Sequence, residues 1–329
     1  MLFPRGRPAS PRADGNARAE DRCRPFPRQR SDRRPRHRDG PVRRRDRRAA
    51  DRVRGFGQAG NTALAWQALG IDFEIAANLG DDQFGRWLRE AFGHRAKKWP
   101  VRPEGTTLSV GMTHPDGERT FFTTRGHLPR FSLDDVLSVL DGNRLAGGYA
   151  LLSGSFLTDD LTRDYGALFD WAEANRIAVA LDTGWPIDGW TEANCAAARG
   201  WLSRCELALF NEVETTTLAG LANPAEAARK IRDGMKAGAT VVVKRGPDGA
   251  IAIGPDGEVI EVPAPRVAVV DTIGAGDVFN AAFLAALAQG RSLEKCLSAA
   301  IRVASRAIST LPRDYGGPTQ FEDAVHERA

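Results

Sequence analysis

Cysteine is scarce in this chain, and the few cysteines present are far apart. The 329 residues include only Cys23, Cys195, Cys205 and Cys296, and these form neither a CxxC pair nor a cluster with histidine. A disulfide framework and a structural zinc site both require such spacing. The sequence therefore supports neither feature, and it indicates a reducing, cytoplasmic setting.

Long apolar runs are also missing. No stretch approaches the roughly 20 consecutive apolar residues that a membrane-spanning helix requires. The N-terminus lacks the apolar segment of a secretory signal. With 42% hydrophobic and 27% charged residues, the chain has enough apolar material to bury a large core. We expect a globular protein with no membrane partner.

Residues 1–54 lack lysine and contain few large apolar side chains. They hold 19 arginines and seven acidic residues, a local balance of +12, so the rest of the chain carries −8 of the overall +4. A segment with so little to bury cannot offset the entropy of ordering its backbone. We expect residues 1–54 to be a disordered, Arg-rich prefix.

Three interpretations of this prefix stay open. Clustered arginines neutralise phosphates, which would suit an arm for nucleic acid or an acidic membrane. The composition favours a tail without function over such an arm, and we expect no nucleic-acid partner. The third interpretation is a gene-model artefact, because Arg, Pro, Ala and Gly without Lys are typical of a GC-rich stretch translated out of frame.

Helical and extended patterns alternate from Gly55 onward, which marks the start of one domain over residues 55–312, followed by a C-terminal tail at 313–329. Single helices separate most strands, and this order favours an α/β fold with a doubly wound, mostly parallel sheet. The expected strands include 71–78, 150–153, 177–182, 206–210 and 240–244. The expected helices are 61–69, 83–97, 133–141, 159–175, 193–203, 224–237, 275–289 and 292–308.

Two hairpins interrupt this alternation. Residues 107–113 and 119–124 flank Pro115-Asp116-Gly117, and a second turn lies at 255–257. We expect the first hairpin to form part of a small β lid.

The segment DTIGAGD at residues 271–277 lies between an extended run and an apolar helix that starts near Ala275. Two glycines at a strand-to-helix junction let backbone N–H groups converge at the positive end of the helix dipole, which suits a phosphate or an oxyanion. An aspartate beside a bound anion is a poor structural choice, but it suits a base that removes a proton from an attacking hydroxyl. The alternative is a tight turn without function, since a lone GxG near a helix start is common.

This segment resembles the DTxGAGD signature of the ribokinase or PfkB family of carbohydrate kinases, and the resemblance extends over residues 55–310. It implies a ribokinase-like fold and transfer of the ATP γ-phosphate to a sugar hydroxyl. By the resemblance, Asp277 is the catalytic base, and the amides of Gly274, Ala275 and Gly276 form the anion hole. Thr272 is then implied in nucleotide binding, and Asp271 in substrate binding.

A second signature of the family is similar to residues 57–61, although Phe56 replaces the first glycine of its GG pair. The resemblance implies that Gly57 and Asn61 contact the sugar, and an amide side chain both donates and accepts hydrogen bonds to hydroxyls. Asn61 as the N-cap of its helix is the alternative. Arg125 after the first hairpin is a further sugar-contact candidate, although a solvated strand face explains it equally well.

Two more segments resemble nucleotide-binding elements of the family. Asn211 and Glu214 match its N-x-x-E element, which implies that Glu214 holds Mg²⁺ through water; an acidic helix start is the alternative. Lys244, Gly246 and Gly249 match its K-x-G-x-x-G turn, where hairpin glycines are the alternative. The resemblance implies ATP and Mg²⁺ as cofactors, leaves a monovalent cation such as K⁺ open, and implies a homodimer formed through the lid.

The N-terminus departs from the family pattern. Family members usually open with an apolar strand whose aspartate binds two sugar hydroxyls and then add lid strands, whereas this chain has the Arg-rich prefix there. We therefore expect a domain without its usual first strand, an incomplete lid and impaired phosphorylation of a sugar or sugar acid. A nucleoside kinase of the adenosine type and a non-catalytic kinase remnant are the alternatives.

Overall fold

The computed structural model describes residues 2–4, 56–113 and 119–326. An eight-stranded sheet runs in the order β12-β11-β10-β9-β8-β7-β1-β2, and two smaller sheets pair β3 with β4 and β5 with β6. The strands of the large sheet are β1 (Leu2–Pro4), β2 (Phe73–Ile75), β7 (Tyr149–Ser153), β8 (Ala178–Asp182), β9 (Leu207–Asn211), β10 (Thr240–Lys244), β11 (Ala250–Ile253) and β12 (Val259–Val262). Those of the small sheets are β3 (Leu79–Gly80), β4 (Val101–Arg102), β5 (Ser109–Thr113) and β6 (Arg119–Thr123).

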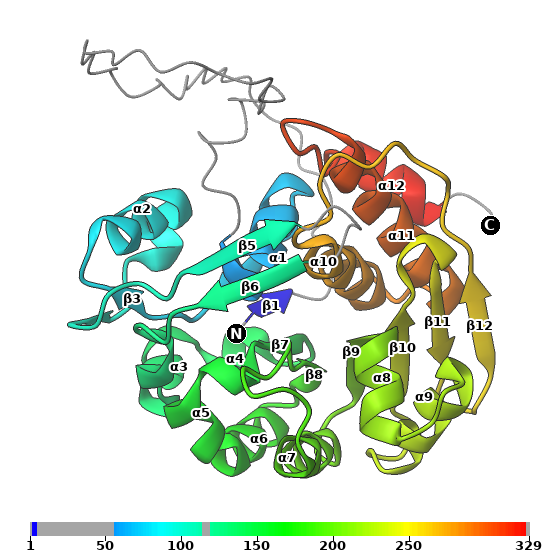
Figure 1. Ribbon diagram of the computed structural model, residues 1–329, viewed down its shortest axis with the longest axis horizontal. Coiled ribbons are helices and arrows are strands. Elements are labelled where there is room, and N and C mark those ends of the chain that lie inside the picture. Colours follow the sequence, from blue (N-terminus) through cyan, green and yellow to red (C-terminus); the bar gives the residue numbers. More distant parts are fainter. Residues whose placement is uncertain (1, 5–55, 114–118, 327–329) are drawn as a thin grey trace, which may run out of the picture. The chain divides into compact units, whose positions relative to one another are not determined.

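Helices connect these strands along the described chain (Figure 1). They are α1 (Gly57–Ala68), α2 (Gln83–Phe92), α3 (Leu133–Val139), α4 (Gly142–Leu145), α5 (Asp159–Arg163), α6 (Tyr165–Ala174), α7 (Glu192–Leu202), α8 (Glu212–Ala219), α9 (Pro224–Asp233), α10 (Ala275–Ala288), α11 (Leu293–Ser309) and α12 (Pro318–His326). None of the helices in the described ranges has both the length and the apolar character needed to cross a membrane.

The centre of the large sheet is parallel. Strands β7 to β10 pair in parallel, and β11 and β12 continue the sheet in antiparallel pairing at one edge. Helices cover both faces, so the prediction of a doubly wound, mostly parallel α/β fold is confirmed.

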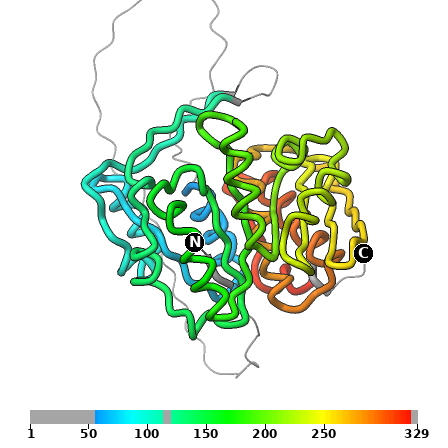
Figure 2. The backbone as a smooth tube through the Cα atoms, turned by 90° about the horizontal axis from the view of Figure 1, so that it is seen from below, coloured from blue at the N-terminus to red at the C-terminus, as the bar shows by residue number. Residues whose placement is uncertain are grey.

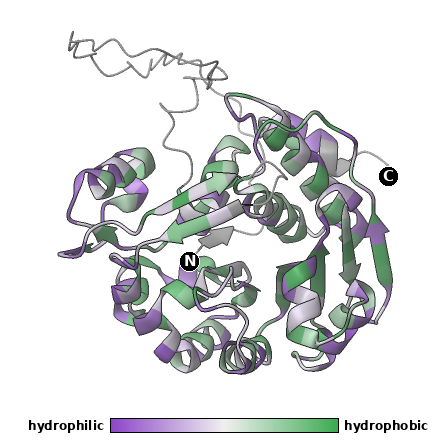
Figure 3. Ribbon diagram, viewed as in Figure 1, coloured by the Kyte–Doolittle hydropathy of each residue, from purple (hydrophilic) through white to green (hydrophobic). Residues whose placement is uncertain are grey.

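The middle residues of these strands are apolar because both faces of the sheet are buried there, and Figure 3 shows this on β9 to β11. Successive side chains of a strand point to opposite faces. Leu207 and Leu209 accordingly join a core built with α1, α10 and α11. Ala208 and Phe210 join a second core with α6, α7 and α9. Figure 2 shows the N-terminal part of the described domain (blue to green) beside its C-terminal part (yellow to red).

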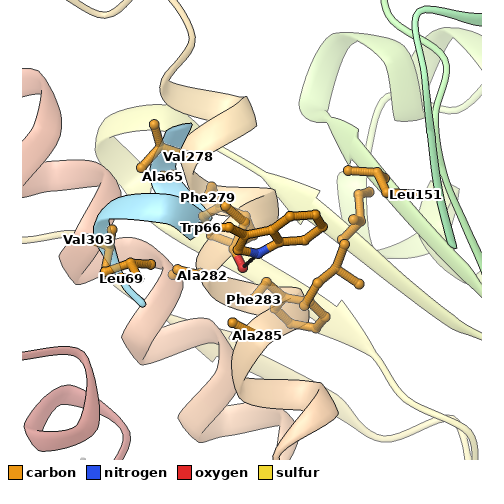
Figure 4. Close-up of a cluster of buried hydrophobic side chains, with 14 of the residues drawn as sticks. Ala65, Trp66, Leu69, Leu151, Val278, Phe279, Ala282, Phe283, Ala285 and Val303 are labelled. Atoms are coloured by element: carbon orange, nitrogen blue, oxygen red, sulfur yellow. Dashed lines mark hydrogen bonds between the residues drawn. The ribbon is translucent and has the colours of Figure 1, made fainter. Parts of the chain in front are cut away.

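Trp66 fixes α1 against α10. The indole is fully buried, and Figure 4 shows it among Phe279, Phe283 and Leu151. Its Nε1 donates to the carbonyl oxygen of Ala281 over 2.7 Å, which satisfies the one polar atom of the ring. This packing matters for the site because α1 carries Asn61 and α10 carries Asp277.

The first hairpin is present as predicted, with β5 and β6 paired from Ser109↔Thr123 to Thr113↔Arg119. Its turn lies outside the described residues. Val110, Phe121 and Phe122 are more than half exposed on these strands, so the hairpin presents apolar surface on the described unit.

The N-terminus differs from the prediction. Leu2–Pro4 form β1, which pairs antiparallel with both β2 and β7 and so completes the sheet between them. The expectation of disorder is therefore wrong for these three residues, because short apolar segments can pair with open strand edges whatever follows them. Residues 5–54 of the expected disordered prefix lie outside the described residues.

The C-terminal segment belongs to the folded unit, which extends past the expected boundary at residue 312. Phe321 of α12 is 1% exposed and packs in the core of α1, α10 and α11. The ring of Pro318 lies so close to Gly70 that a Cβ at Gly70 would approach it to 2.7 Å. Residues 313–329 were expected to be a tail because one short helix gives a weak periodic signal.

Asp82 links the start of α2 to Thr106, which precedes the lid hairpin. Its carboxylate accepts hydrogen bonds from the amides of Phe84 and Gly85 and from both the amide and the hydroxyl of Thr106. Partial burial raises the pKa of Asp82, but these donors outweigh burial and hold it at about 2. A carboxylate with this many donors stabilises the fold in its charged form.

Replacing Asp82 by Ala is expected to lower the free energy of unfolding by roughly 2 kcal/mol, because a helix cap and charge-assisted hydrogen bonds are lost together. Since the folded pKa lies below the unfolded value, this contribution is present above about pH 4 and fades as the pH falls towards about 2. Urea unfolding at several pH values measures it. The exposed neighbour Asp81 is the control, and equal losses for Asp81→Ala and Asp82→Ala would refute the assignment.

Candidate active site

Three polar residues lie at the ends of adjacent parallel strands. Asp182, Asn211 and Lys244 are the last residues of β8, β9 and β10, and Asn211 is in register with Lys244. The carboxyl ends of parallel strands meet at one edge of the sheet, where α/β proteins place their ligands. The sheet therefore gathers side chains that are 62 positions apart in sequence, as in the pair of Asp182 and Lys244.

The predicted loop 271–277 leads into α10 at this edge. Gly274 precedes α10 with φ 74° and ψ 12°, and no side chain caps the helix. The described residues provide no hydrogen-bond acceptor for the amides of Gly276 and Asp277. These amides, at the positive end of a 14-residue helix, form a candidate anion hole. Ala275 is less suited to it, because its amide donates to the carbonyl of Thr272.

Glycine is required at position 274. Its φ lies in the left-handed region, and an added Cβ would come within 2.7 Å of Asn61 Nδ2. A Cβ at Gly276 would lie 3.4 Å from Lys244 Nζ. The two glycines therefore bring the start of α10 close to an amide on one side and to an ammonium group on the other.

Asp277 is buried in the first turn of α10. Asn61 Nδ2 donates to its Oδ2 over 2.8 Å, and the hydroxyl of Thr62 donates to its backbone carbonyl over 3.1 Å. Burial raises the pKa of Asp277 to about 7, with a further rise from Asp182, while Asn61, Lys244 and Arg313 oppose the rise. A carboxyl group that titrates near neutrality is well matched to general base catalysis.

Asn61 does not cap its helix. Phe56 holds the N-cap position of α1, and Asn61 lies in the second turn, where its Oδ1 accepts from the amide of Phe56 over 3.2 Å. The capping alternative is thus wrong, and the amide group instead links the start of α1 to Asp277. Gly57, the first residue of α1, has φ 68°, a conformation that favours glycine.

Lys244 and Asp182 form a buried ion pair. Lys244 Nζ lies 2.8 Å from Asp182 Oδ2 and 3.2 Å from Asn280 Oδ1, and Asn280 Nδ2 donates to the same carboxylate oxygen over 2.6 Å. Burial disfavours the charged form of Lys244, but Asp182 and Glu214 outweigh burial and raise its pKa. A permanent positive charge therefore lies beside the candidate anion hole.

Glu214 is buried at the start of α8. Asn211 and Glu214 form a capping box, in which Asn211 Oδ1 accepts from the Glu214 amide over 2.8 Å and Glu214 Oε2 accepts from the Asn211 amide over 2.9 Å. Glu214 therefore does cap the start of a helix, as the alternative predicts, but this role does not explain why its side chain is buried. Glu214 is 5% exposed, and burial raises its pKa to about 7, with Asp182 adding to the rise. A surface cap needs no such buried charge.

Other predicted site residues are held by different contacts. Gly249 is required for packing, because a Cβ there would approach the carbonyl of Val262 to 2.0 Å, and Gly246 begins a short turn with φ 55°. Arg125 forms an exposed ion pair with Asp159. Asp271 Oδ1 accepts from the amide of Ile273 over 3.0 Å.

Four residues of this region were not identified from sequence. Gln58 Nε2 donates to Asp182 Oδ1 over 3.4 Å, and Thr62, Asn280 and Arg313 make the contacts described above and below. Asn280 carried a usable signal, since it is a polar residue one turn after Asp277 in an otherwise apolar helix. No sequence pattern indicates Arg313, because its contacts depend on how the chain folds after α11.

The residues present fit ATP and Mg²⁺. The uncapped amides of α10 and the ammonium of Lys244 suit phosphate oxygens. The hydroxyl of Thr183, which follows Asp182, is buried and lacks a hydrogen-bond partner among the described residues. A buried polar group of this kind is expected where a polar ligand binds. No three His, Cys, Asp or Glu side chains of the described residues cluster as direct metal ligands. Such a site is compatible with Mg²⁺, which keeps several waters.

Comparison with known proteins identifies a family. The family model described as pfkB family carbohydrate kinase matches residues 41–312. Mouse ketohexokinase is 42% identical over 84 residues, which are 25% of this chain and 28% of that protein. Ribokinase of Arabidopsis thaliana is 27% identical over 268 residues, 77% of this chain and 66% of that protein. The chain thus spans less than two thirds of both relatives.

The fold has close counterparts among solved structures. The aminoimidazole riboside kinase of Salmonella enterica, complexed with aminoimidazole riboside and an ATP analogue, superposes with a TM-score of 0.67 at 22% identity. The match covers 82% of this chain and 91% of that one. With a ribokinase-like fold and a family match over most of its length, the chain belongs to the pfkB family of carbohydrate kinases.

Proposed function

We propose that this protein transfers the γ-phosphoryl group of ATP to a hydroxyl of a sugar or sugar acid. The observation that carries the proposal is Asp277, a buried carboxyl group with a pKa of about 7 in the first turn of an uncapped helix. Its only side-chain hydrogen bond among the described residues is donated by Asn61. One carboxylate oxygen is thereby left for a substrate proton.

In the proposed reaction, the substrate hydroxyl oxygen forms a bond to the γ-phosphorus as the bond to the ADP oxygen breaks. Asp277 takes the hydroxyl proton, and the amides of Gly276 and Asp277 hold the transferring phosphoryl oxygens. Lys244 supplies fixed positive charge beside them. Mg²⁺, when bound, neutralises phosphate charge, and Glu214 would hold it through water.

Asn61 is the residue that links base and substrate. Its Nδ2 positions Asp277, and its place in the second turn of α1, one turn after Gly57, supports the predicted role of Asn61 and Gly57 in contacting a sugar hydroxyl. Arg125 and Asp271 remain weaker candidates for substrate contacts, since both are engaged in ion pairs. Thr272, Gly246 and Gly249 remain proposals for the nucleotide side.

Reduced turnover is part of this proposal. Leu2–Pro4 complete the sheet, and these three residues, which are all that the structure describes before Phe56, provide no acid for the sugar hydroxyls. Three buried free thiols, Cys195, Cys205 and Cys296, support a cytoplasmic protein. The exposed Val110, Phe121 and Phe122 of the lid hairpin support the homodimer that the resemblance implies.

The test is a panel of phosphoryl acceptors with the purified full-length chain, ATP and Mg²⁺. Pentoses, ketohexoses, sugar acids and an adenosine-type nucleoside are compared by ADP release and by phosphorus NMR of the product. A phosphorylated sugar or sugar acid, formed more slowly than the roughly 1–100 per second of ordinary kinases, supports the proposal. Preference for the nucleoside favours the alternative substrate class. No product from any acceptor indicates a non-catalytic remnant.

The proposal predicts a specific pH dependence. Asp277 accepts a proton only when ionised, so kcat/KM should rise as the pH rises through about 7. Burial places the pKa of Glu214 at about 7 as well, so the rise can be steeper than that of one group. Rates measured from about pH 5 to about pH 9 check this. A rate already maximal at about pH 5 would remove Asp277 from the role of base.

A further inference from the structure

Arg313 contacts the back of the predicted anion-hole loop. Its Nη2 lies 2.6 Å from the carbonyl oxygen of Ile273, 3.5 Å from that of Asp271 and 3.4 Å from Asp271 Oδ2. Both side chains of this ion pair are mostly buried, at 20% and 15% exposure. A guanidinium group thus meets three oxygens from the residues directly before Gly274.

These contacts orient the loop. In a trans peptide, the carbonyl oxygen and the following N–H point in opposite directions. Holding the Ile273 carbonyl towards Arg313 therefore turns the Gly274 N–H away from Arg313 and fixes the peptide that leads into α10, whose first turn carries the amides of Gly276 and Asp277. The Asp271 carbonyl fixes the Thr272 N–H in the same way.

Arg313 also lies close to the reacting groups. A Cβ at Gly274 would lie 3.3 Å from Arg313 Nη1 and 2.7 Å from Asn61 Nδ2, so Gly274 separates the guanidinium from the amide that holds Asp277. Arg313 joins Lys244 and Asn61 in lowering the pKa of Asp277, against the larger effect of burial and that of Asp182. Its charge therefore acts on the candidate base.

The segment that carries Arg313 is well anchored. The Asp314 amide donates to the hydroxyl of Thr310 over 2.8 Å, Tyr315 packs against the core of α1, α10 and α11, and α12 follows. The position of the guanidinium is thus set by the fold rather than by a free side chain at a chain end.

We propose that Arg313 is a positioning residue that serves as a built-in cation for the anion-hole loop, so that phosphoryl transfer needs no added monovalent cation. The inference rests on the proposed kinase function. An arginine is suited to this place because its planar group donates to several oxygens at once and stays charged at every working pH.

Three linked expectations follow from this proposal. The native chain should turn over at equal rates in K⁺, Na⁺ and tetramethylammonium buffers. Arg313→Ala should lower kcat by roughly 10- to 100-fold, the effect of losing hydrogen bonds to a charged group, with a smaller change in the KM for the sugar. Added guanidinium or K⁺ should restore part of this rate, because the variant removes the guanidinium group that contacts these three loop oxygens.

Further variants separate positioning from folding. Arg313→Lys should retain more activity than Arg313→Met, which preserves the apolar stem but not the charge. In Arg313→Met, the acid limb of the pH profile should move upwards, since Asp277 loses a neighbouring positive charge while Asp182 and Lys244 remain. Arg306→Ala is the matched control, because it removes an exposed ion pair with Asp314 in the same segment but contacts no residue of the loop.

The readouts distinguish failure of this inference from failure of the proposed function. ADP affinity of the native chain, measured by calorimetry, requires no turnover, and its absence would count against both the kinase assignment and this inference. If the native chain binds ADP and turns over, the inference is overturned by strong K⁺ dependence, by equal losses in Arg306→Ala and Arg313→Ala, or by full activity of Arg313→Met. If thermal melts show that Arg313→Ala does not fold, the activities of Arg313→Met and Arg313→Lys test the inference instead.

Discussion

Asp277→Asn is expected to lower kcat by roughly 10²- to 10⁴-fold, the range typical of a lost general base. The substitution should leave the surrounding structure intact, because the new amide oxygen can still accept from Asn61 Nδ2. ADP affinity should be nearly unchanged, since the amides and Lys244 are untouched. Steady-state kinetics and calorimetry of ADP binding measure the two effects.

The stability of this variant provides an internal check. Burial disfavours ionised Asp277, so replacing it with a neutral amide should not lower the free energy of unfolding at pH 8 or above. The exposed Asp256 is the matched control for an acid-to-amide change. A loss of kcat below about tenfold, or a loss that also occurs in Asp256→Asn, would show that Asp277 is not the base.

Lys244→Met is expected to have the largest effect on stability, a decrease of about 3–5 kcal/mol in the free energy of unfolding. It leaves the carboxylate of Asp182, 5% exposed, without its ammonium partner. The hydrogen bonds from Asn280, Gln58 and Gly184 remain and compensate in part. Urea unfolding at about pH 8 measures the effect.

The double variant Lys244→Met with Asp182→Asn identifies the cause. If the cost comes from an unpaired buried charge, removing that charge should recover much of the stability lost in Lys244→Met. If the stability losses from the two substitutions instead add, the unpaired charge of the broken ion pair is not the source of the destabilisation. Phosphoryl transfer should be lost in both variants, because the positive charge beside the anion hole is absent from each.

The middle strands of the sheet and most helices were predicted correctly from the sequence. The predicted strand 240–244 has the same bounds as β10, and the predicted helices 193–203 and 292–308 are each displaced by one residue from α7 and α11. These elements have a strong periodic pattern and clear end signals. The sequence did not predict β1 or α12, because both are short and depend for their structure on packing against other elements.

The candidate site was predicted unevenly for the same reason. Asp277, Gly274 and Asn61 lie in local motifs, and the structure brings them together. Gly249 and Arg125 lie in motifs too, yet their contacts are a close backbone approach and a surface ion pair. A motif restricts which residue types are present, but it does not specify which atoms they meet.

The sequence by itself determined the alternation of strands and helices, the family resemblance and the choice of Asp277 as candidate base, because each depends on residues near one another in the chain. Only the tertiary structure decided the burial of Asp277, which moves its pKa to about 7. It also decided the pairing of Lys244 with Asp182 and the contact of Arg313 with the carbonyl oxygens of Asp271 and Ile273. Burial and long-range pairing depend on how distant segments pack, and the packing at the ends of β8, β10 and α11 is what assembles this site.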